Sequence, residues 1–139
     1  MKSFVLDASV ALRWFLDNPV PSYANRVKQF LIRGTRVVVP ALWHLEMSNG
    51  LAMAERRSIL TQADVEQAMI DIEQIVVQAV DTDSMVVPLR QSLATARAFR
   101  LSAYNAVYLD LARGYKLPLA TLDVQLRTAA GQANVELLR

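Results

Sequence analysis

The chain has 139 residues, of which 53% are hydrophobic and 20% are charged, and its formal net charge is +2. This composition indicates one globular domain over residues 1–139, and so small a basic excess does not by itself indicate nucleic-acid binding. The absence of cysteine excludes disulfides, thiolate metal sites and cysteine nucleophiles. Asp7 interrupts the first apolar run and no stretch is long enough to cross a bilayer, so we expect a cytoplasmic protein without signal peptide or membrane span.

The predicted elements alternate between strands and helices along the chain. Residues 4–6 form an apolar run without alternation, which is typical of a strand buried on both faces, and the run ends at Asp7. A helix over residues 10–16 is expected to begin at Ser9 as its N-cap. Further helices are expected over residues 22–33, 43–54, 61–76, 88–99, 103–113 and 124–130. Further strands are expected over residues 37–40, 77–80 and 117–120, with a weak strand over 135–138.

Cap and turn residues bound these elements. The predicted caps and stops are Ser22, Gly34, Thr61, Ser102 and Gly114. Residues 55–58 are predicted to form an exposed turn, and the apolar stripe over residues 65–76 is predicted to be core or a protein interface. Strands that alternate with helices predict an α/β fold with a mainly parallel sheet covered on both faces.

Acidic residues follow two of the predicted strands, at Asp7 and Asp123. The carboxyl ends of parallel strands meet at one edge of a sheet, so we expect these two acids to lie near one another. Two helices bring further polar groups to that edge, one with Glu46 and Asn49 on one side and one with Asn105 near its start. Clustered carboxylates repel one another unless a cation binds, and oxygen ligands suit Mg²⁺ or Mn²⁺. Such an ion polarises a phosphate oxygen and activates a water for in-line attack.

Four stretches, at residues 5–12, 40–49, 101–109 and 119–123, resemble the acidic motifs of PIN-domain ribonucleases. In length and flanks the chain is similar to VapC-type toxins of type II toxin–antitoxin pairs, and the resemblance covers nearly the whole chain. Each motif alone is weakly specific, whereas four in order at suitable spacings are fairly specific. The resemblance implies a three-layer α/β/α sandwich and a metal-dependent endoribonuclease that uses Mg²⁺ or Mn²⁺. It also implies an RNA substrate, a cognate antitoxin and a homodimer.

The resemblance assigns roles to individual residues. The positions that match the family's catalytic and metal-binding residues are Asp7, Glu46, Asn105 and Asp123. The positions that match its supporting residues are Ser9, Asn49 and Thr121. The departure is Asn105, where the family normally has Asp, and an amide is neutral and coordinates through only one oxygen. The resemblance therefore predicts a weakened metal site, whether the amide is natural or was introduced to make a toxic enzyme tolerable.

Other interpretations of these residues stay open. Asp123 also suits the N-cap of the last helix, and Asp110 is expected to pair with Arg113 at i+3 rather than to join the site. His44 is the one histidine, and one histidine makes no zinc site. The alternative function is a catalytically silent PIN-like module that binds RNA or a protein, because Asn105 removes one charge from the acidic ring.

Overall fold

A four-stranded parallel sheet forms the centre of the protein in a computed structural model that describes residues 3–139. Its strand order is β3-β2-β1-β4, and the strands are β1 (Phe4–Leu6), β2 (Val37–Pro40), β3 (Val80–Asp83) and β4 (Leu119–Ala120). The register pairs Val5 with Val38 of β2 and with Leu119 of β4. β1 is therefore a central strand, and its carboxyl end lies beside that of β4.

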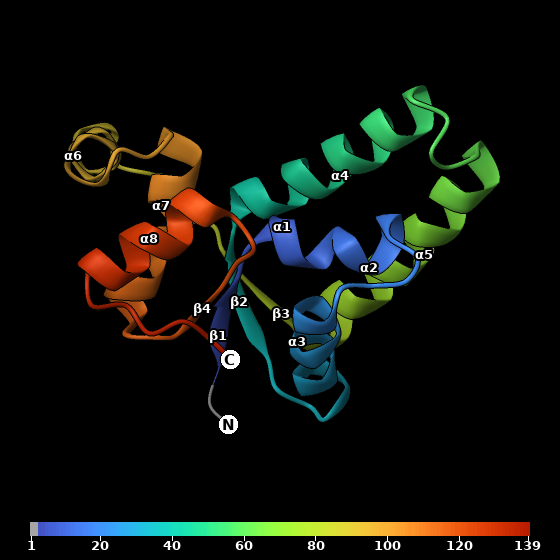
Figure 1. Ribbon diagram of the computed structural model, residues 1–139, viewed down its shortest axis with the longest axis horizontal. Coiled ribbons are helices and arrows are strands. Elements are labelled where there is room, and N and C mark those ends of the chain that lie inside the picture. Colours follow the sequence, from blue (N-terminus) through green and yellow to red (C-terminus); the bar gives the residue numbers. More distant parts are fainter. Residues whose placement is uncertain (1–2) are drawn as a thin grey trace.

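Helices cover both faces of the sheet and complete a three-layer α/β/α fold (Figure 1). One side carries α6 (Leu89–Phe99), α7 (Ala103–Tyr115) and α8 (Val124–Gln132). The other side carries α1 (Ala8–Ala11), α2 (Arg13–Leu16), α3 (Ser22–Ile32), α4 (Ala41–Arg56) and α5 (Gln62–Ala79). Among residues 3–139, no helix combines the length and the apolar composition that crossing a bilayer requires.

Burial of β1, β2 and β4 explains their unbroken apolar runs. All three residues of β1 are fully buried, and the ring of Phe4 meets Phe30 of α3 edge-on at 5.9 Å between centroids. The indole N–H of Trp14 donates to the carbonyl of Ala24 at 2.8 Å, which ties α2 to α3. A strand covered on both faces has no polar side to alternate with, so the predicted parallel sheet is confirmed.

Most predicted elements are present, but several boundaries differ. Ser9 is not an N-cap, because α1 already begins at Ala8 and the N-cap position belongs to Asp7. The strand predicted over residues 77–80 is wrong: α5 continues to Ala79 and β3 begins at Val80. The β-branched run Ile75-Val76-Val77 continues this helix, although such a run suits a strand as well, because packing decides between the two.

Four more predictions differ from the structure in detail. The turn predicted over 55–58 begins later, because α4 runs to Arg56. Gly114 lies inside α7, and the left-handed residue that ends the helix is Lys116 at φ 56°. β4 is only two residues long, since Pro118 just before it lacks an N–H to donate. The weak strand over 135–138 is a single parallel bridge between Leu119 and Leu137.

Candidate active site

The carboxyl edge of β1 and β4 holds a buried carboxylate, Asp7. Its backbone N–H donates to the carbonyl of Ala120 at 2.9 Å, so β4 and the residues that follow it are held against the end of β1. This pairing brings Thr121 and Asp123, more than a hundred residues away in sequence, beside Asp7. The juxtaposition expected from the strand ends is present.

A hydroxyl network fixes Asp7 in place. Thr121 donates to Oδ2 of Asp7 at 2.6 Å and Ser9 donates to the same oxygen at 2.7 Å. In turn the backbone N–H of Leu122 donates to the Ser9 hydroxyl at 3.0 Å, and that of Asp123 to the Thr121 hydroxyl at 3.0 Å. Each hydroxyl therefore both donates and accepts, and the carboxylate orientation is coupled to the backbone after β4.

Asp123 begins α8 as well as facing the site. One of its carboxylate oxygens accepts the backbone N–H of Leu126 at 2.8 Å, which is an N-cap bond. The capping interpretation left open by the sequence is thus confirmed. Asp123 also lines the same cavity as Asp7, so capping does not remove it from the site.

Glu46 reaches the site from α4. Asn49 and Gly50, one turn further, line the same cavity, as their i+3 and i+4 spacing predicts. At Gly50 an added Cβ would lie 2.5 Å from a methyl of Leu12, so α4 approaches the α1–α2 segment closely at this point. Glu46 Oε1 accepts a hydrogen bond of 2.6 Å from the hydroxyl of Tyr108 on α7.

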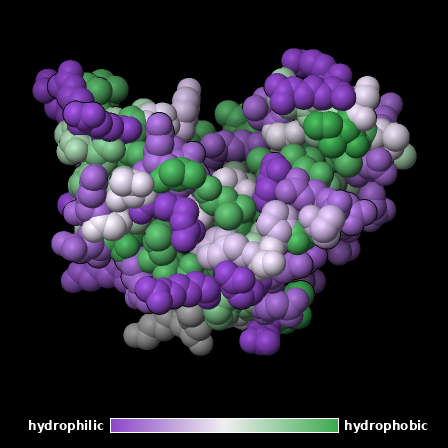
Figure 2. Space-filling model, viewed as in Figure 1, coloured by the Kyte–Doolittle hydropathy of each residue, from purple (hydrophilic) through white to green (hydrophobic). Residues whose placement is uncertain are grey.

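These side chains converge on one cavity of about 680 Å³. Its lining residues are Asp7, Ala8, Ser9, Leu12, Leu42, Leu45, Glu46, Asn49, Gly50, Tyr104, Asn105 and Asp123. Thr121 lies behind this wall, fully buried, and acts on the cavity through Asp7. Figure 2 shows the surface hollowed along the upper edge of the molecule, between the α6–α7 side and α4.

Burial and neighbouring negative charge raise the pKa values of two acids in this strand-end cavity. Burial raises the pKa of Asp7 above its usual range, and the charge of Asp123 adds to the rise while the Thr121 and Ser9 hydroxyls oppose it. Burial likewise raises the pKa of Glu46, with a further contribution from the charge of Asp7 and opposition from the Tyr108 hydroxyl. Carboxylates whose ionised forms are disfavoured in this way gain from a bound cation.

The donor set suits a hard divalent ion that keeps part of its water. Among residues 3–139, no three Asp, Glu or His side chains are grouped tightly enough to form a ready-made metal site. Mg²⁺ commonly binds through one or two carboxylates and retains several waters, so it does not need such a group. The oxygen-only lining of Asp7, Glu46, Asp123 and the amide of Asn105 fits that chemistry.

Two residues that contact the site residues from behind the cavity wall were missed by the sequence interpretation. Tyr108 is fully buried, and burial together with the charges of Asp7 and Glu46 raises its pKa far above the usual value, so it stays a neutral donor. Arg127 donates to the carbonyl of Thr121 at 2.8 Å while its guanidinium lies 5.2 Å from the ring centre of Tyr23. The spacing of Tyr108 gives no signal, because Glu46 lies 62 positions earlier and only the fold brings the two together, whereas Arg127 makes a local contact six residues from Thr121.

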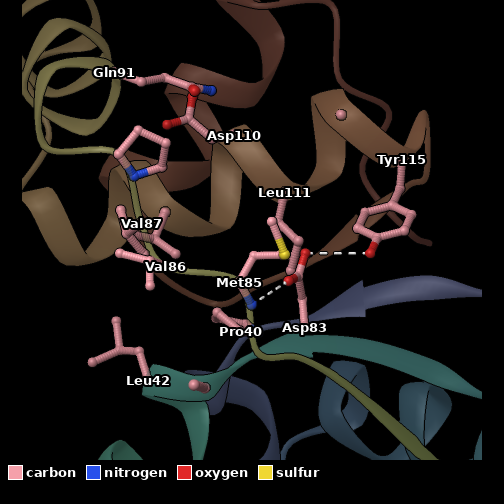
Figure 3. Close-up of a pocket in the computed structure, with 14 residues that line it drawn as sticks. Pro40, Leu42, Asp83, Met85, Val86, Val87, Gln91, Asp110, Leu111 and Tyr115 are labelled. Atoms are coloured by element: carbon pink, nitrogen blue, oxygen red, sulfur yellow. Dashed lines mark hydrogen bonds between the residues drawn. The ribbon is translucent and has the colours of Figure 1, made fainter.

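Asp110 lies outside this cavity. It accepts a 2.7 Å hydrogen bond from Thr95 of α6, and it lines a second cavity of about 370 Å³ together with Asp83 and Tyr115 (Figure 3). Burial raises its pKa, and the Thr95 hydroxyl and the charge of Arg113 oppose that rise. The predicted pairing is therefore replaced by a bond to Thr95. His44 hydrogen-bonds to Thr82 through Nε2 at 2.8 Å, away from the acids.

Comparisons with known proteins bear on what this cavity does. The chain is 34% identical over 129 residues to a VapC ribonuclease of Mycobacterium bovis, covering 93% of this chain and 91% of that protein. Ribonuclease VapC9 of Mycobacterium tuberculosis matches with the same identity and coverage. The crystal structure of PAE2754 from Pyrobaculum aerophilum has a similar fold, with a TM-score of 0.67 and 22% identity over 91% of this chain and 78% of that one. No protein-family model matches the chain.

Proposed function

Because the chain belongs to the VapC family of ribonucleases, we propose that it is a toxin endoribonuclease that hydrolyses RNA phosphodiesters in the strand-end cavity. The observation that carries this proposal is the convergence of Asp7, Glu46 and Asp123 from three separate segments onto one cavity. A role in helix capping or surface solvation would not require them to converge. Because the proposed substrate is RNA, we expect the protein to act in the cytoplasm.

The proposed cofactor is Mg²⁺ or Mn²⁺, held by Asp7, Glu46 and Asp123, with Asn105 as a neutral fourth donor. Such an ion, when bound, supplies Lewis acidity to the phosphodiester and lowers the pKa of a water. The raised pKa values of Asp7 and Glu46 support this proposal, since burial, helped by neighbouring negative charge, disfavours the ionised carboxylates and a bound cation would offset that effect.

The chain's own side chains keep the acids oriented. Thr121 and Ser9 share one oxygen of Asp7, which restricts rotation of that carboxylate. Tyr108 does the same for Glu46 from α7. Hydrogen bonds from neutral hydroxyls favour the ionised carboxylates without adding positive charge that would compete with a cation.

The rim of the cavity offers a surface for the RNA. Tyr104 lines the cavity and is 64% exposed, and Leu45, another lining residue, is also exposed. Unstacked bases of single-stranded RNA stack on aromatic side chains of this kind. We therefore assign Tyr104 to base contact beside the scissile phosphate.

Two protein partners complete the proposal: a cognate antitoxin that blocks the cavity, and a second copy of the chain in a homodimer. The family membership supports the antitoxin. For the dimer, exposed apolar residues on α5 and along the segment that leads into α6 supply surface, among them Ile70, Val77, Val86 and Leu89. Light scattering at micromolar concentration is expected to give the mass of a dimer, and a monomer would remove this part of the proposal.

The proposed activity is tested by cleavage of single-stranded RNA with Mn²⁺ present or chelated. The chain should cleave only with the metal, and Asp7→Asn should remove cleavage. Asp110→Asn is the matched control, because it makes the same chemical change at a half-buried acid of the neighbouring cavity. It should cleave within about two-fold of the unchanged chain.

The second candidate function is a catalytically silent module that binds RNA or a protein. Asn105 favours it, because the amide leaves the acidic ring one charge short. The same assay separates the two functions. RNA that binds without metal-dependent cleavage, even in Asn105→Asp, would support the silent module.

A further inference from the structure

The carbonyl of Thr121 is a buried acceptor that lies one residue beyond the end of the sheet. Thr121 is fully buried, and the preceding residue, Ala120, is the last of β4. The carbonyl of Ala120 accepts the backbone N–H of Asp7 at 2.9 Å, whereas among residues 3–139 no backbone N–H donates to the carbonyl of Thr121. A buried carbonyl without a donor is costly, so a side chain is needed to bond it.

Arg127 supplies this donor from the first turn of α8. Its guanidinium donates to the Thr121 carbonyl at 2.8 Å. Arg127 is half-buried and does not belong to the lining of the strand-end cavity, so it reaches Thr121 from behind the cavity wall. Within the described range 3–139 it forms no ion pair with an acid. The side chain of Arg127 therefore bonds the backbone beside the site and does not neutralise a carboxylate.

Tyr23 of α3 limits the positions that the guanidinium can take. The ring centre of Tyr23 lies 5.2 Å from the guanidinium carbon of Arg127, which is a cation–π distance. The Tyr23 hydroxyl donates to the carbonyl of Leu138 at 2.7 Å, so the ring is itself held in place. Burial raises the pKa of Tyr23, and Arg127 and the backbone of Thr121 oppose that rise. The phenol of Tyr23 thus lies close to both partners of the Arg127–Thr121 hydrogen bond.

One peptide group connects Arg127 to Asp7. The carbonyl of Thr121 and the N–H of Leu122 belong to the same planar, trans peptide group, so they point in opposite directions. Arg127 bonds the carbonyl at 2.8 Å, and the Ser9 hydroxyl accepts the N–H at 3.0 Å. The hydroxyls of Ser9 and Thr121 both donate to Oδ2 of Asp7. Rotation of this one peptide group would therefore disturb both of the hydroxyls that hold the carboxylate.

We propose that Arg127 is a positioning residue of the strand-end cavity. Its guanidinium fixes the peptide group between Thr121 and Leu122, and the two hydroxyls pass that constraint to Asp7. The effect on RNA cleavage rests on the proposed nuclease function, whereas the effect on the peptide group does not. Because Arg127 does not line the cavity, it should influence the catalytic step and leave RNA binding unchanged.

The first test is amide hydrogen exchange in the ¹⁵N-labelled full chain without metal or RNA. Arg127→Met keeps a long side chain but removes the donor, and the Leu122 amide should then exchange faster. We expect its increase to be at least about five-fold larger than any increase at Val38 and Val39 of β2, which report general loss of stability. Arg127→Lys retains a donor for the carbonyl and should recover most of the protection.

Arg26→Met provides the matched control. The Arg26 guanidinium lies 5.6 Å from the centre of the same Tyr23 ring, and its loss changes the net charge by the same amount. Arg26 is exposed and makes no hydrogen bond to Thr121. Its substitution should change exchange of the Leu122 amide less than about two-fold. Equal exchange of this amide in the two Met variants, or an increase in Arg127→Met no larger than that of the β2 amides, would overturn the proposal.

The second test is the kinetics of metal-dependent RNA cleavage. Arg127→Met should lower kcat about ten-fold and change KM less than about two-fold, and Arg127→Lys should regain part of the kcat, while Arg26→Met should match the unchanged chain. A raised KM with an unchanged kcat would make Arg127 an RNA-binding residue and overturn the positioning role. If the unchanged chain cleaves no RNA, the nuclease proposal fails, and hydrogen exchange alone decides whether Arg127 fixes the peptide group.

Discussion

The two sides of the strand-end cavity are built differently. On the strand side, Asp7 is 4% exposed and is held by hydroxyls of Ser9 and Thr121 that are themselves bonded to backbone. On the helix side, Glu46 is half-buried with one bond, to Tyr108, while Asn105 has its side chain among the cavity lining. The strand side is a network and the helix side a set of single contacts.

The site residues on the two sides are therefore held to different degrees before any ligand binds. Thr121 and Asp7 sit at the ends of two paired strands, whose backbone positions are fixed by the sheet. Glu46 and Asn105 sit on α4 and α7, outside the hydrogen-bonded strand pairs, and each helix packs against other helices as well as against the sheet. A site residue that several hydrogen bonds hold is better preorganised to bind an ion than one held by a single bond. Substitutions on the strand side should therefore cost more than those on the helix side.

The largest effect is expected for Asp7→Asn. Cleavage should fall at least roughly a hundred-fold, because the best-ordered carboxylate of the site is lost. The metal-free protein should nevertheless melt at a higher temperature, since the variant removes a buried charge that repels Asp123 and Glu46. Saturating Mn²⁺ should raise the melting temperature of the unchanged chain and have less effect on the variant. An unchanged response to Mn²⁺ would show that Asp7 binds no metal.

The pH dependence of the metal-free chain follows from the same carboxyl. The folded state raises the pKa of Asp7 above its ordinary 3.8, so the folded protein holds a proton that the unfolded chain has released. Stability should therefore fall as pH rises from about 4 through the raised pKa, with Glu46 contributing in the same direction. Thermal melts in a metal-free pH series should show this fall, and Asp7→Asn should reduce it.

Thr121→Val should have the next largest effect. The substitution keeps the shape of a fully buried side chain, but it removes a donor to Asp7 and the acceptor of the Asp123 N–H. We expect a loss of about 2–3 kcal/mol in the free energy of unfolding and a roughly 10–100-fold loss of cleavage. Thr82→Val is the control, because that hydroxyl is bonded to His44 at the exposed surface. If urea unfolding gives the two variants the same loss in the free energy of unfolding, the hydrogen bonds of Thr121 do not have the stabilising role that we assign to them.

The sheet and its site edge were predictable because their signals are local. The unbroken apolar run of β1 and the acid directly after it predict both the strand and the position of Asp7. Gly34 and Ser102 likewise mark helix boundaries through their own conformational preferences. The limits of α5 were mispredicted, because the run Ile75-Val76-Val77 suits a strand as well as a helix and only packing decides.

Contacts between elements were not predictable in the same way. Tyr108 lies three residues beyond Asn105, and nothing in that spacing indicates a bond to Glu46, 62 positions earlier. Asp110 was expected to pair within its own helix, and Thr95 of α6 provides its bond instead. The metal role of the four site positions and the single-domain organisation of residues 1–139 stay predictions.

Asn105→Asp tests whether the helix side can be strengthened. A fourth carboxylate adds one negative charge around a divalent ion, and at close range this should raise metal affinity. We expect metal-dependent cleavage to become about ten-fold faster, which requires the activation barrier to fall by only about 1.4 kcal/mol. We also expect the variant to be more toxic to a host without the antitoxin. Asp110→Ala, measured at the same Mn²⁺ concentration, should have little effect. If Asn105→Asp cleaves RNA no faster than the unchanged chain and Asp110→Ala does not cleave at all, Asp110 rather than Asn105 is the fourth metal ligand.

The smallest effect is expected for Tyr108→Phe, which removes the single bond on the helix side. The ring stays buried, and water can reach a half-buried Glu46, so the loss in unfolding free energy should be about 1 kcal/mol and the loss in cleavage only a few-fold. The sharper readout is the pH profile. The Tyr108 hydroxyl lowers the pKa of Glu46 against the effect of burial, so the variant should raise that pKa further.

A carboxyl that acts in its ionised form becomes protonated, and therefore inactive, already at a higher pH when its pKa rises. The acidic limb of the cleavage profile should therefore move to higher pH in Tyr108→Phe, with a larger deficit at pH 5.5 than at pH 8. Tyr115→Phe provides the control, because its hydroxyl donates to Asp83 at the surface of the neighbouring cavity and touches no site acid. A limb that stays in place while cleavage falls equally at all pH values would mean that Tyr108 positions Glu46 without affecting its charge. The helix side would then differ from the strand side, where the Thr121 and Ser9 hydroxyls both hold Asp7 in place and lower its pKa against the effect of burial.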